Sequence, residues 1–319
     1  MTALAGFAVA ALCLAPSSDL EAGEARSKVF LDGQPVAVHF NDGDSFRVVN
    51  GEANGTKARL VGFNTLESYG PVHQWGTWTA KEMFVLAKMA TLNARRGIWK
   101  CENTGEADTY NRALIYCPGL AEDQIRKGLA HVMTVSDEPG FPELVAAQQD
   151  AIANRRGIWA HGVPEYVMTS LHSIDESLGR KQRERNYNRL VSSVDGHSVK
   201  WKHQDLYKEC QKVCHQVYEV DEERVTEVAR EVQADPKLTA LFSGLNADQI
   251  RKVIRDFARD RHINRSIPED ERPGLKAHLQ TLVDKGSFGP KATVGIDATC
   301  VIHAPFKRRY GGGKAACLK

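Results

Sequence analysis

Four segments of the chain combine carboxylates, an amide and arginines at short spacing. They read NDGDS at 41–45, RLVGFNTLE at 59–67, DTYNRAL at 108–114, and GLA at 128–130 followed later by RGIW at 156–159. Hydrolysis of a phosphodiester needs charge neutralisation at the phosphate, an activated water and a fixed geometry. Carboxylates, amide oxygens and guanidinium groups can supply all three. The segments therefore predict phosphodiester chemistry, provided that the fold brings them together.

Each polar residue in these segments has a role that its chemistry allows. Hard oxygen ligands can hold a cation such as Ca²⁺, and Mn²⁺ accepts much the same ligands. The candidate ligands are the Asp44 carboxylate, the Asn64 amide oxygen and the Thr65 carbonyl. Glu67 can orient or deprotonate a water molecule, and Arg59 and Arg112 can bind phosphate oxygens in a bidentate manner.

Each segment alone also has an ordinary structural explanation. Asp-Gly-Asp is typical of a tight turn, in which Gly43 would supply special backbone angles. Arg59 on a strand would commonly form a surface salt bridge, and Arg112 after a Tyr-Asn turn would commonly lie in a solvated loop. The functional interpretation therefore depends on the order and spacing of the segments on the predicted elements.

Those elements are strands first and helices second. Alternating apolar and polar residues over 29–63, with Asn-Gly and Asp-Gly turns, predict antiparallel strands. Apolar residues at helical spacing predict a helix over 75–94, and cap and spacing signals predict helices over 122–131 and 142–156. Between them, residues 97–117 return to a strand–turn–strand pattern. The expected fold class is α+β, with a five-stranded β-barrel of the OB type plus α-helices.

The order and spacing of the four segments resemble the staphylococcal-nuclease-like, or thermonuclease, family over about residues 28–162. The shared features are the DGD turn, the R-L-x-G-x-[DN]-T-x-E strand end, the D-x-Y-x-R-x-L segment, the G-L-A helix end and the closing G-I-W. The resemblance implies a calcium-dependent nuclease. Members of this family cleave single-stranded or breathing DNA and RNA at the 5′ P–O bond and leave 3′-phosphates.

The resemblance also implies a metal site. Asp44 and Asn64 would bind calcium through their side chains and Thr65 through its carbonyl, with Asp42 supporting the metal from behind. Asn64 stands where the family typically has Asp, which removes one negative charge. We therefore expect weaker cation binding than in a site with two carboxylates.

By the same resemblance, Glu67 would act on the attacking water, while Arg59 and Arg112 would stabilise the transition state and the leaving group. Tyr110 matches a tyrosine that flanks the nucleotide pocket. Leu66 replaces the usual proline before the glutamate, which loosens a rigid turn.

The charge balance gives little support to nucleic-acid binding by bulk electrostatics. The formal net charge is only +2, and residues 28–162 carry fourteen Lys and Arg against fifteen Asp and Glu. The segment 132–136 has Met133 and Thr134 where aromatic residues would help to stack a base, and the lysine-rich lip of the family is missing. If the protein binds single-stranded DNA or RNA, a few placed charges must do it.

The N-terminus predicts export. Residues 3–15 form an uncharged apolar run of the length of a signal-peptide core, so residues 1–27 are interpreted as a signal peptide or export segment. The run is too short to span a bilayer comfortably, and we expect no stable membrane span. A basic start is missing. Cys13 leaves a lipoprotein open, although Leu12 occupies a position where such sites want a small residue.

Six cysteines remain in the mature part, an even number that favours disulfides in a secreted or periplasmic protein. Cys101 and Cys117 flank a hairpin symmetrically and could face each other. Cys210 and Cys214 are four residues apart on a predicted helix over 204–232. Each should reach a distant partner, Cys300 or Cys317. The alternative is zinc, with His203, His215 or His303 as further ligands.

Residues 163–319 predict an extension and a mainly helical, disulfide-stapled region whose function the sequence does not identify. A hairpin is expected over 186–201, and cap residues near 235, 246 and 268 predict further helices. Arg251, Arg255 and Arg259 would line one side of a helix, as a nucleic-acid contact or as a solvated face. His172 is interpreted as a structural histidine rather than a general base.

The leading hypothesis is therefore a secreted, calcium-dependent endonuclease without an obligate protein partner. Two other classes stay open. One is a catalytically degenerate OB-fold module that binds nucleic acid or an envelope partner. The other is a structural envelope protein held together by disulfides.

Overall fold

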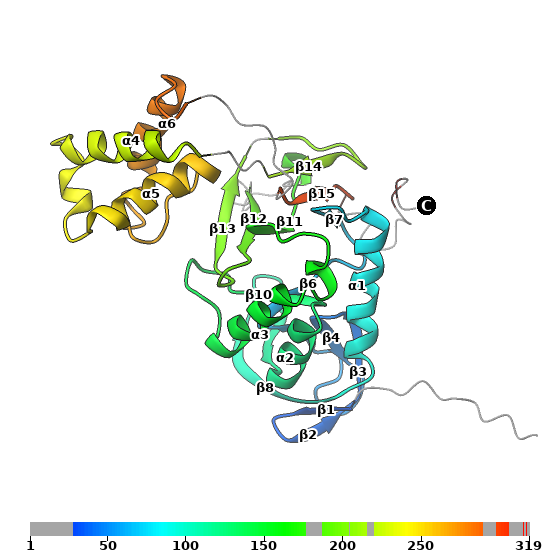
Figure 1. The fold of residues 1–319 in the computed structure, drawn as a ribbon. Coiled ribbons are helices and arrows are strands. Elements are labelled where there is room, and N and C mark those ends of the chain that lie inside the picture. The colour runs from blue at the N-terminus through cyan, green and yellow to red at the C-terminus, as the bar shows by residue number, and fades with distance from the viewer. Residues whose placement is uncertain are drawn as a thin grey trace, which may run out of the picture.

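The structure, a computed structural model, describes residues 28–176, 187–203, 205–215, 220–289, 298–305, 315 and 317. It is a mixed α+β fold in which a curled sheet with its helices adjoins smaller sheets and a separate group of helices (Figure 1). The predicted export segment at 1–27, with Cys13, lies outside the described residues. Within the described part, no helix is long and apolar enough to cross a membrane.

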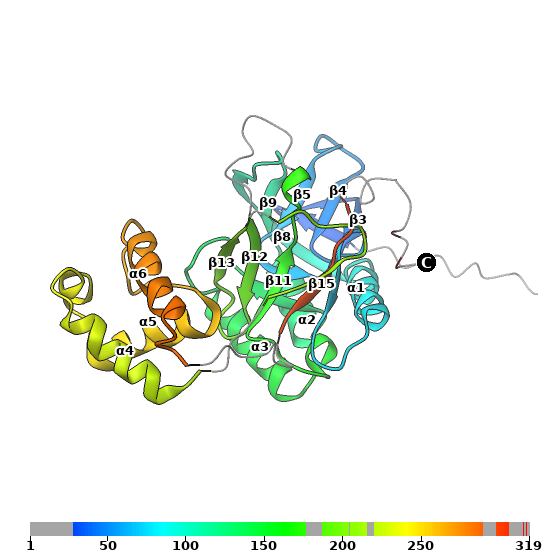
Figure 2. The same ribbon diagram turned by 90° about the horizontal axis from the view of Figure 1, so that it is seen from above.

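The largest sheet has seven strands and curls into half a barrel, as Figures 1 and 2 show from two sides. Its strand order is β2-β1-β8-β9-β5-β4-β3. The strands are β1 (Lys28–Leu31), β2 (Gln34–Val36), β3 (Val38–Asp42), β4 (Ser45–Val48), β5 (Lys57–Leu60), β8 (Ile98–Ala107) and β9 (Ala113–Tyr116). The strands predicted over 29–63 and 97–117 are thus confirmed, whereas five-stranded OB closure is not.

Alternating side chains of this sheet form the main core. On β4, Phe46 and Val48 are fully buried while Arg47 between them is exposed, the period of two that a half-buried strand requires. The ring of Phe40 on β3 packs edge-on against Phe46, with 5.4 Å between centroids. The helix α2 (Pro118–Arg126) contributes further apolar side chains to the same cluster.

Two further helices flank the sheet, α1 (Ala80–Ala94) and α3 (Pro142–Ala153). The helix α1 begins later than its predicted start at residue 75, because Thr79 and Glu82 form a capping box at its first turn. The helix α3 begins at Pro142 as predicted, since proline has no N–H to satisfy and its backbone angle suits the first helical position.

The segment after α2 differs from the prediction. A helix was expected over 122–131, but the chain leaves α2 through Gly128, at φ 65°, and enters the strand β10 (Ala130–Met133). A Cβ at Gly128 would lie 2.2 Å from the carbonyl oxygen of Arg156. The GLA and RGIW segments therefore meet backbone to backbone, which only glycine permits at this position.

Within the described residues, three smaller sheets link distant parts of the chain. Besides β10, their strands are β6 (Gly62–Thr65), β7 (Val72–Gln74), β11 (Tyr166–Ser170), β12 (Tyr187–Ser192), β13 (Ser198–Lys202), β14 (Lys212–Cys214) and β15 (Cys300–Ile302). The strand β10 pairs with β6, and β12 and β13 form the predicted hairpin beside β11. The strand β15 lies between β14 and β7, so a strand near the C-terminus pairs with one in the N-terminal half.

The helix predicted over 204–232 is wrong in its first part. Cys210 has a positive φ of 65° in a turn, and the next residues form β14. The register of β14 pairs Val213 with Val301, a contact far along the chain that overrides the local helical spacing. Among the described residues of this range, the helical part is α4 (Glu222–Ala234).

The group of helices has its own apolar core and lies beside β12 and β13 in both ribbon views (Figures 1 and 2). It consists of α4, η4 (Thr239–Phe242), α5 (Ala247–Asp260) and α6 (Arg272–Asp284). The helix α5 begins after Asn246 as predicted, because Asn246 and Gln249 form a capping box. We call these helices, residues 220–289, the helical bundle.

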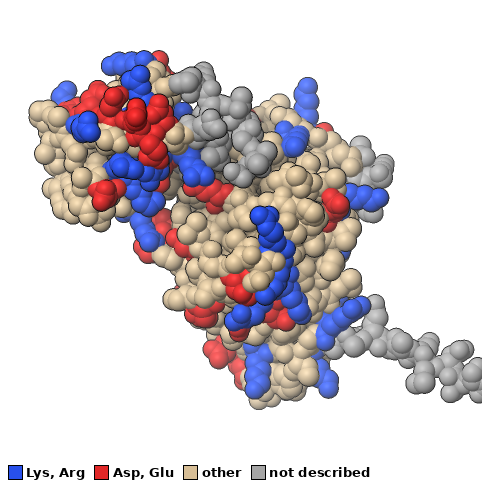
Figure 3. Space-filling view, viewed as in Figure 1, with Lys and Arg blue, Asp and Glu red and all other residues tan. Residues whose placement is uncertain are grey.

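Charged side chains join the helical bundle to the rest of the protein. The ion pairs are Arg259–Glu165 at 2.5 Å, Arg272–Asp137 at 2.8 Å and Arg265–Glu138 at 3.6 Å. Arg251 and Arg255 bind Glu222 at 3.3 and 2.7 Å. The arginine row of α5 is thus paired with carboxylates, and Figure 3 shows both signs of charge gathered on the bundle.

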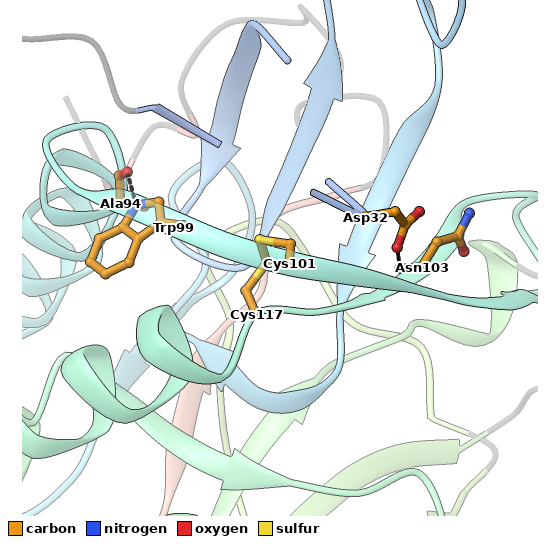
Figure 4. Close-up of a disulfide and its surroundings, with 6 residues drawn as sticks. All are labelled: Asp32, Ala94, Trp99, Cys101, Asn103 and Cys117. Carbon is orange, nitrogen blue, oxygen red and sulfur yellow. Dashed lines mark hydrogen bonds between the residues drawn. A yellow bond between two sulfur atoms is a disulfide. The ribbon is translucent and has the colours of Figure 1, made fainter. Parts of the chain in front are cut away.

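In the described part of the chain, three disulfides cross-link the fold: Cys101–Cys117, Cys210–Cys317 and Cys214–Cys300. The predicted bridge across the hairpin and the distant partners of Cys210 and Cys214 are confirmed. Because these sulfurs are bonded to each other, the zinc alternative is wrong for them. Figure 4 shows Cys101–Cys117 tying β8 to the start of α2. On either side, β8 is held by bonds from Trp99 Nε1 to the Ala94 carbonyl and from the Asn103 amide to Asp32.

Candidate active site

The turn between β3 and β4 carries two carboxylates. Asp42 ends β3, and its Oδ1 accepts a bond from the Ser45 hydroxyl at 2.6 Å. Gly43 is not in the left-handed region, so the prediction that it supplies special backbone angles is wrong. A Cβ at Gly43 would lie 2.5 Å from the Thr65 methyl and 3.0 Å from the Ala90 Cβ. Glycine is needed here because β6 and α1 approach the turn closely.

Arg59 on β5 bridges two of the predicted cation ligands. Its Nη1 donates to Asp44 Oδ1 and its Nη2 donates to Asn64 Oδ1, both at 2.5 Å. The side chain of Asp44 is 3% exposed and that of Arg59 is 18% exposed, so the ion pair is largely shielded from water. Charge-assisted bonds of this kind are about twice as strong as neutral ones.

The end of β6 completes the cluster. The backbone amide of Thr65 donates to Asp44 Oδ2 at 2.7 Å, and its hydroxyl lies 3.2 Å from the same oxygen. Asn64 Nδ2 donates to the Thr65 carbonyl at 2.8 Å. The fold thus brings Asp44, on the β3–β4 turn, to Thr65 at the end of β6, and Arg59 links Asp44 to Asn64.

Asp42 and Glu67 lie at the margin of this cluster. Burial raises the pKa of Asp42 well above its ordinary value, and the negative charges of Asp44 and Glu67 raise it further. The Ser45 hydroxyl and the Arg59 guanidinium lower that pKa only in part. Glu67 therefore lies close enough to Asp42 for its negative charge to be felt there.

Arg112 and Tyr110 lie on the turn between β8 and β9. Asp108 organises this turn, because its Oδ1 accepts from the backbone amides of Tyr110 and Arg112, each at 2.9 Å. Its Oδ2 accepts from Arg112 Nε at 2.7 Å. The guanidinium lies 5.6 Å from the centroid of the exposed Tyr110 ring. Arg112 is thus held by Asp108, just before β9 runs parallel to β5, the strand that carries Arg59.

The oxygen atoms of the cluster are of the types that bind hard cations. The cluster offers a carboxylate, an amide oxygen and a backbone carbonyl, and the first two already share the positive charge of Arg59. Among the residues that the structure describes, no group of three or more His, Cys, Asp or Glu side chains is arranged to hold a metal ion. A cation here would depend on Asn64 and the Thr65 carbonyl besides Asp44.

His131 is a site residue that the sequence did not predict. The register of β10 against β6 pairs it with Asn64, and its Nε2 lies 3.4 Å from Asn64 Nδ2. Its Nδ1 lies 2.9 Å from the Val132 carbonyl oxygen. Burial lowers the pKa of His131 to about 4, despite the opposing bond to Val132 and the charge of Asp44. The helix expected over 122–131 concealed this cross-strand position.

The segment after β10 is covered by the β12–β13 hairpin. The Thr134 amide donates to the Gly196 carbonyl at 2.9 Å, and the Ser198 amide donates to the Ser136 carbonyl at 2.7 Å. The C-terminal half of the chain therefore contacts the segment in which the sequence lacks stacking aromatics. Tyr110, on the turn between β8 and β9, is exposed, as is Tyr69, two residues after Glu67.

The histidines of the C-terminal half are held in contacts of their own. The His172 amide donates to Asn188 Oδ1 at 3.0 Å, and its Nδ1 lies 3.9 Å from a Glu176 oxygen. The other Glu176 oxygen lies 3.4 Å from His303 Nε2. These contacts agree with the interpretation of His172 as a structural residue.

The cluster at Asp44 thus brings together a carboxylate, an amide oxygen, a backbone carbonyl and a guanidinium. No known protein-family model matches the chain, and a search of curated proteins finds no match either. The function must therefore be argued from the residues of the site.

Proposed function

We propose that this protein is an exported, calcium-dependent endonuclease that hydrolyses phosphodiesters of single-stranded DNA or RNA to 3′-phosphate products. The observation that carries the proposal is the grouping of Asp44, Asn64 and Thr65 around the Arg59 guanidinium, with the charge of Glu67 felt at Asp42. The resemblance of residues 28–162 to the staphylococcal-nuclease-like family, with its OB-type barrel, belongs to this proposal.

The cation would be held by Asp44, Asn64 and the Thr65 carbonyl, with Asp42 behind them. When bound, it supplies positive charge that neutralises the phosphate. Arg59 now satisfies the two side-chain oxygens of this set, so cation binding requires the guanidinium to leave them. The released guanidinium is then available to a phosphate oxygen, since it lies within the same site.

The remaining steps belong to the side chains of the chain itself. Glu67 orients a water molecule and accepts its proton as the water oxygen attacks phosphorus. The P–O5′ bond breaks, which leaves a 3′-phosphate on one fragment, and the departing O5′ alkoxide takes a proton from solvent water to become the 5′-hydroxyl of the other. Arg59 and Arg112 bind the phosphate oxygens as negative charge develops, and Tyr110 flanks the nucleotide.

Export is supported by the disulfides. Three bridges within the described chain are expected in an oxidising compartment such as the periplasm or the extracellular space. Calcium at millimolar concentration is found in such surroundings, which suits a site with a single carboxylate ligand.

The experiment is digestion of heat-denatured DNA by the purified, oxidised protein with calcium or with a chelator. Glu67→Gln should slow cleavage by about 10²–10⁴-fold, the usual contribution of general base catalysis. Glu52→Gln is the matched control, since Glu52 is an exposed carboxylate on the β4–β5 loop of the same half-barrel. Equal activity with chelator, or in Glu67→Gln, would remove the proposal.

A non-catalytic module that binds nucleic acid or an envelope partner is the second candidate. The observation that favours it is the closed arrangement of Arg59, which satisfies Asp44 and Asn64 without a cation. This candidate predicts that single-stranded DNA is bound but not cleaved at any calcium or manganese concentration.

A further inference from the structure

Asn64 makes polar contacts at both ends of its side-chain amide: one end accepts a hydrogen bond and the other donates. The oxygen accepts from Arg59 Nη2, and the nitrogen donates to the Thr65 carbonyl at 2.8 Å. The same nitrogen lies 3.4 Å from His131 Nε2. Asn64 and His131 are 5% and 1% exposed, so water cannot easily replace these partners.

The protonation of His131 follows from its other nitrogen. His131 Nδ1 lies 2.9 Å from the Val132 carbonyl oxygen, which can only accept a hydrogen bond. The Nδ1 atom therefore carries the hydrogen of the neutral ring, and Nε2 presents a lone pair. That lone pair faces the NH₂ group of Asn64, which has a second hydrogen to donate.

We propose that His131 is a positioning residue that fixes the Asn64 amide with its oxygen toward the cation position. This inference rests on the proposed function of the site. A flipped amide would direct its oxygen at two acceptors, the Thr65 carbonyl and His131 Nε2, and its NH₂ group at the Arg59 guanidinium. A carboxylate at position 64 would meet the same two acceptors. His131 thus specifies a neutral amide as the ligand on β6.

The register of the two strands explains how His131 reaches this place. The antiparallel pair β6–β10 sets His131 directly opposite Asn64, and neighbouring strands bring such partners within side-chain reach. The next residue of β10 is bonded separately from α3, because Gln148 Oε1 accepts from the Val132 amide at 2.7 Å. Gln148 is fully buried and makes its other bond to the Ser193 carbonyl.

The test uses three variants of the whole oxidised protein. His131→Leu removes the acceptor, His131→Gln restores an acceptor at the position of Nε2, and Gln148→Leu removes a buried amide that bonds Val132 and Ser193 instead of Asn64. The first measurement is the ¹⁵N spectrum and hydrogen exchange of the Asn64 side-chain amide. We expect slow exchange in wild type, His131→Gln and Gln148→Leu, and loss of protection in His131→Leu.

The second measurement is calcium affinity by titration calorimetry with calcium ions alone. Loss of one hydrogen bond predicts a fall of about three- to tenfold in His131→Leu, with His131→Gln and Gln148→Leu within about twofold of wild type. An unchanged Asn64 amide in folded His131→Leu would overturn the positioning role. Altered protection of the Asn64 amide with unchanged calcium affinity would show that the orientation set by His131 does not matter for calcium binding. If wild type neither binds calcium nor cleaves DNA, the proposed function fails, whereas the amide spectra still decide the role of His131.

Discussion

Replacing Arg59 with methionine should strengthen calcium binding while it abolishes catalysis. The guanidinium now donates to both Asp44 Oδ1 and Asn64 Oδ1, so a cation must displace two charge-assisted hydrogen bonds. Methionine keeps an unbranched apolar stem but offers neither a donor nor a positive charge. The two oxygens are then left for the cation.

The magnitude follows from the burial of the ion pair. Each hydrogen bond to a charged group contributes about 1.5–3 kcal/mol. If calcium no longer has to break even one such bond, its affinity should rise by about tenfold. The same change leaves the Asp44 carboxylate, 3% exposed, without its cationic partner. We expect the calcium-free variant to lose about 3 kcal/mol of stability, the lower end for a broken buried pair, because Arg59 keeps 18% exposure.

The assay combines calcium titration calorimetry with urea denaturation at low and at saturating calcium. Calcium should stabilise Arg59→Met more than wild type, by about 1.4 kcal/mol for each tenfold gain in affinity. Arg47→Met, on the neighbouring strand β4, is the matched control, since it removes one exposed positive charge from the same sheet. Calcium affinity in Arg59→Met equal to or weaker than in wild type would refute the competition between guanidinium and cation.

Three further predictions concern the scaffold and its pH dependence. Replacing Cys101 and Cys117 together with alanine should cost about 3 kcal/mol of stability, the chain-entropy value for a loop of this size, and unchanged urea denaturation would contradict this. Gly43→Ala should cost about 1–3 kcal/mol and impair calcium binding, because the added Cβ would lie 2.5 Å from the Thr65 methyl; a variant with wild-type stability and affinity would show that the turn relaxes freely. Burial, with the neighbouring His131, lowers the pKa of His73 to about 3 in the folded protein. As pH falls below about 6.5, His73 therefore binds a proton in the unfolded chain but stays neutral in the folded one. The stability contributed by neutral His73 is present above that pH and is lost below it, by about 2 kcal/mol between pH 7 and pH 5, and His73→Leu should lack this part of the acid sensitivity.

Local sequence patterns predicted the elements whose signals are local. The hairpin between Cys101 and Cys117, the helix that begins at Pro142 and the helix capped by Asn246 all follow from turn, cap and periodicity rules. These features depend on residues a few positions apart. Asp44 and Asn64 are twenty positions apart, and their grouping was expected from the family resemblance of the segments; in the structure both bond Arg59.

Contacts between distant segments were not predictable in the same way. The spacing of apolar residues around Cys210 resembles a helix, but pairing of Val213 with Val301 makes a strand. The role of His131 depends on its register with Asn64 across β6 and β10, and no spacing within either strand reveals it. Nor could sequence show that Gly43 is required by the approach of Thr65 rather than by its own backbone angles.

The measurement that tests the nuclease proposal most directly is single-turnover cleavage of an end-labelled single-stranded oligonucleotide, with the new ends identified chemically. In calcium, wild type should produce 3′-phosphate and 5′-hydroxyl ends, and Glu67→Gln should be at least about a hundredfold slower. A chelator should abolish the reaction. Cleavage that survives Glu67→Gln, or that leaves 5′-phosphate ends, would contradict the site and mechanism proposed for Asp44, Asn64 and Glu67.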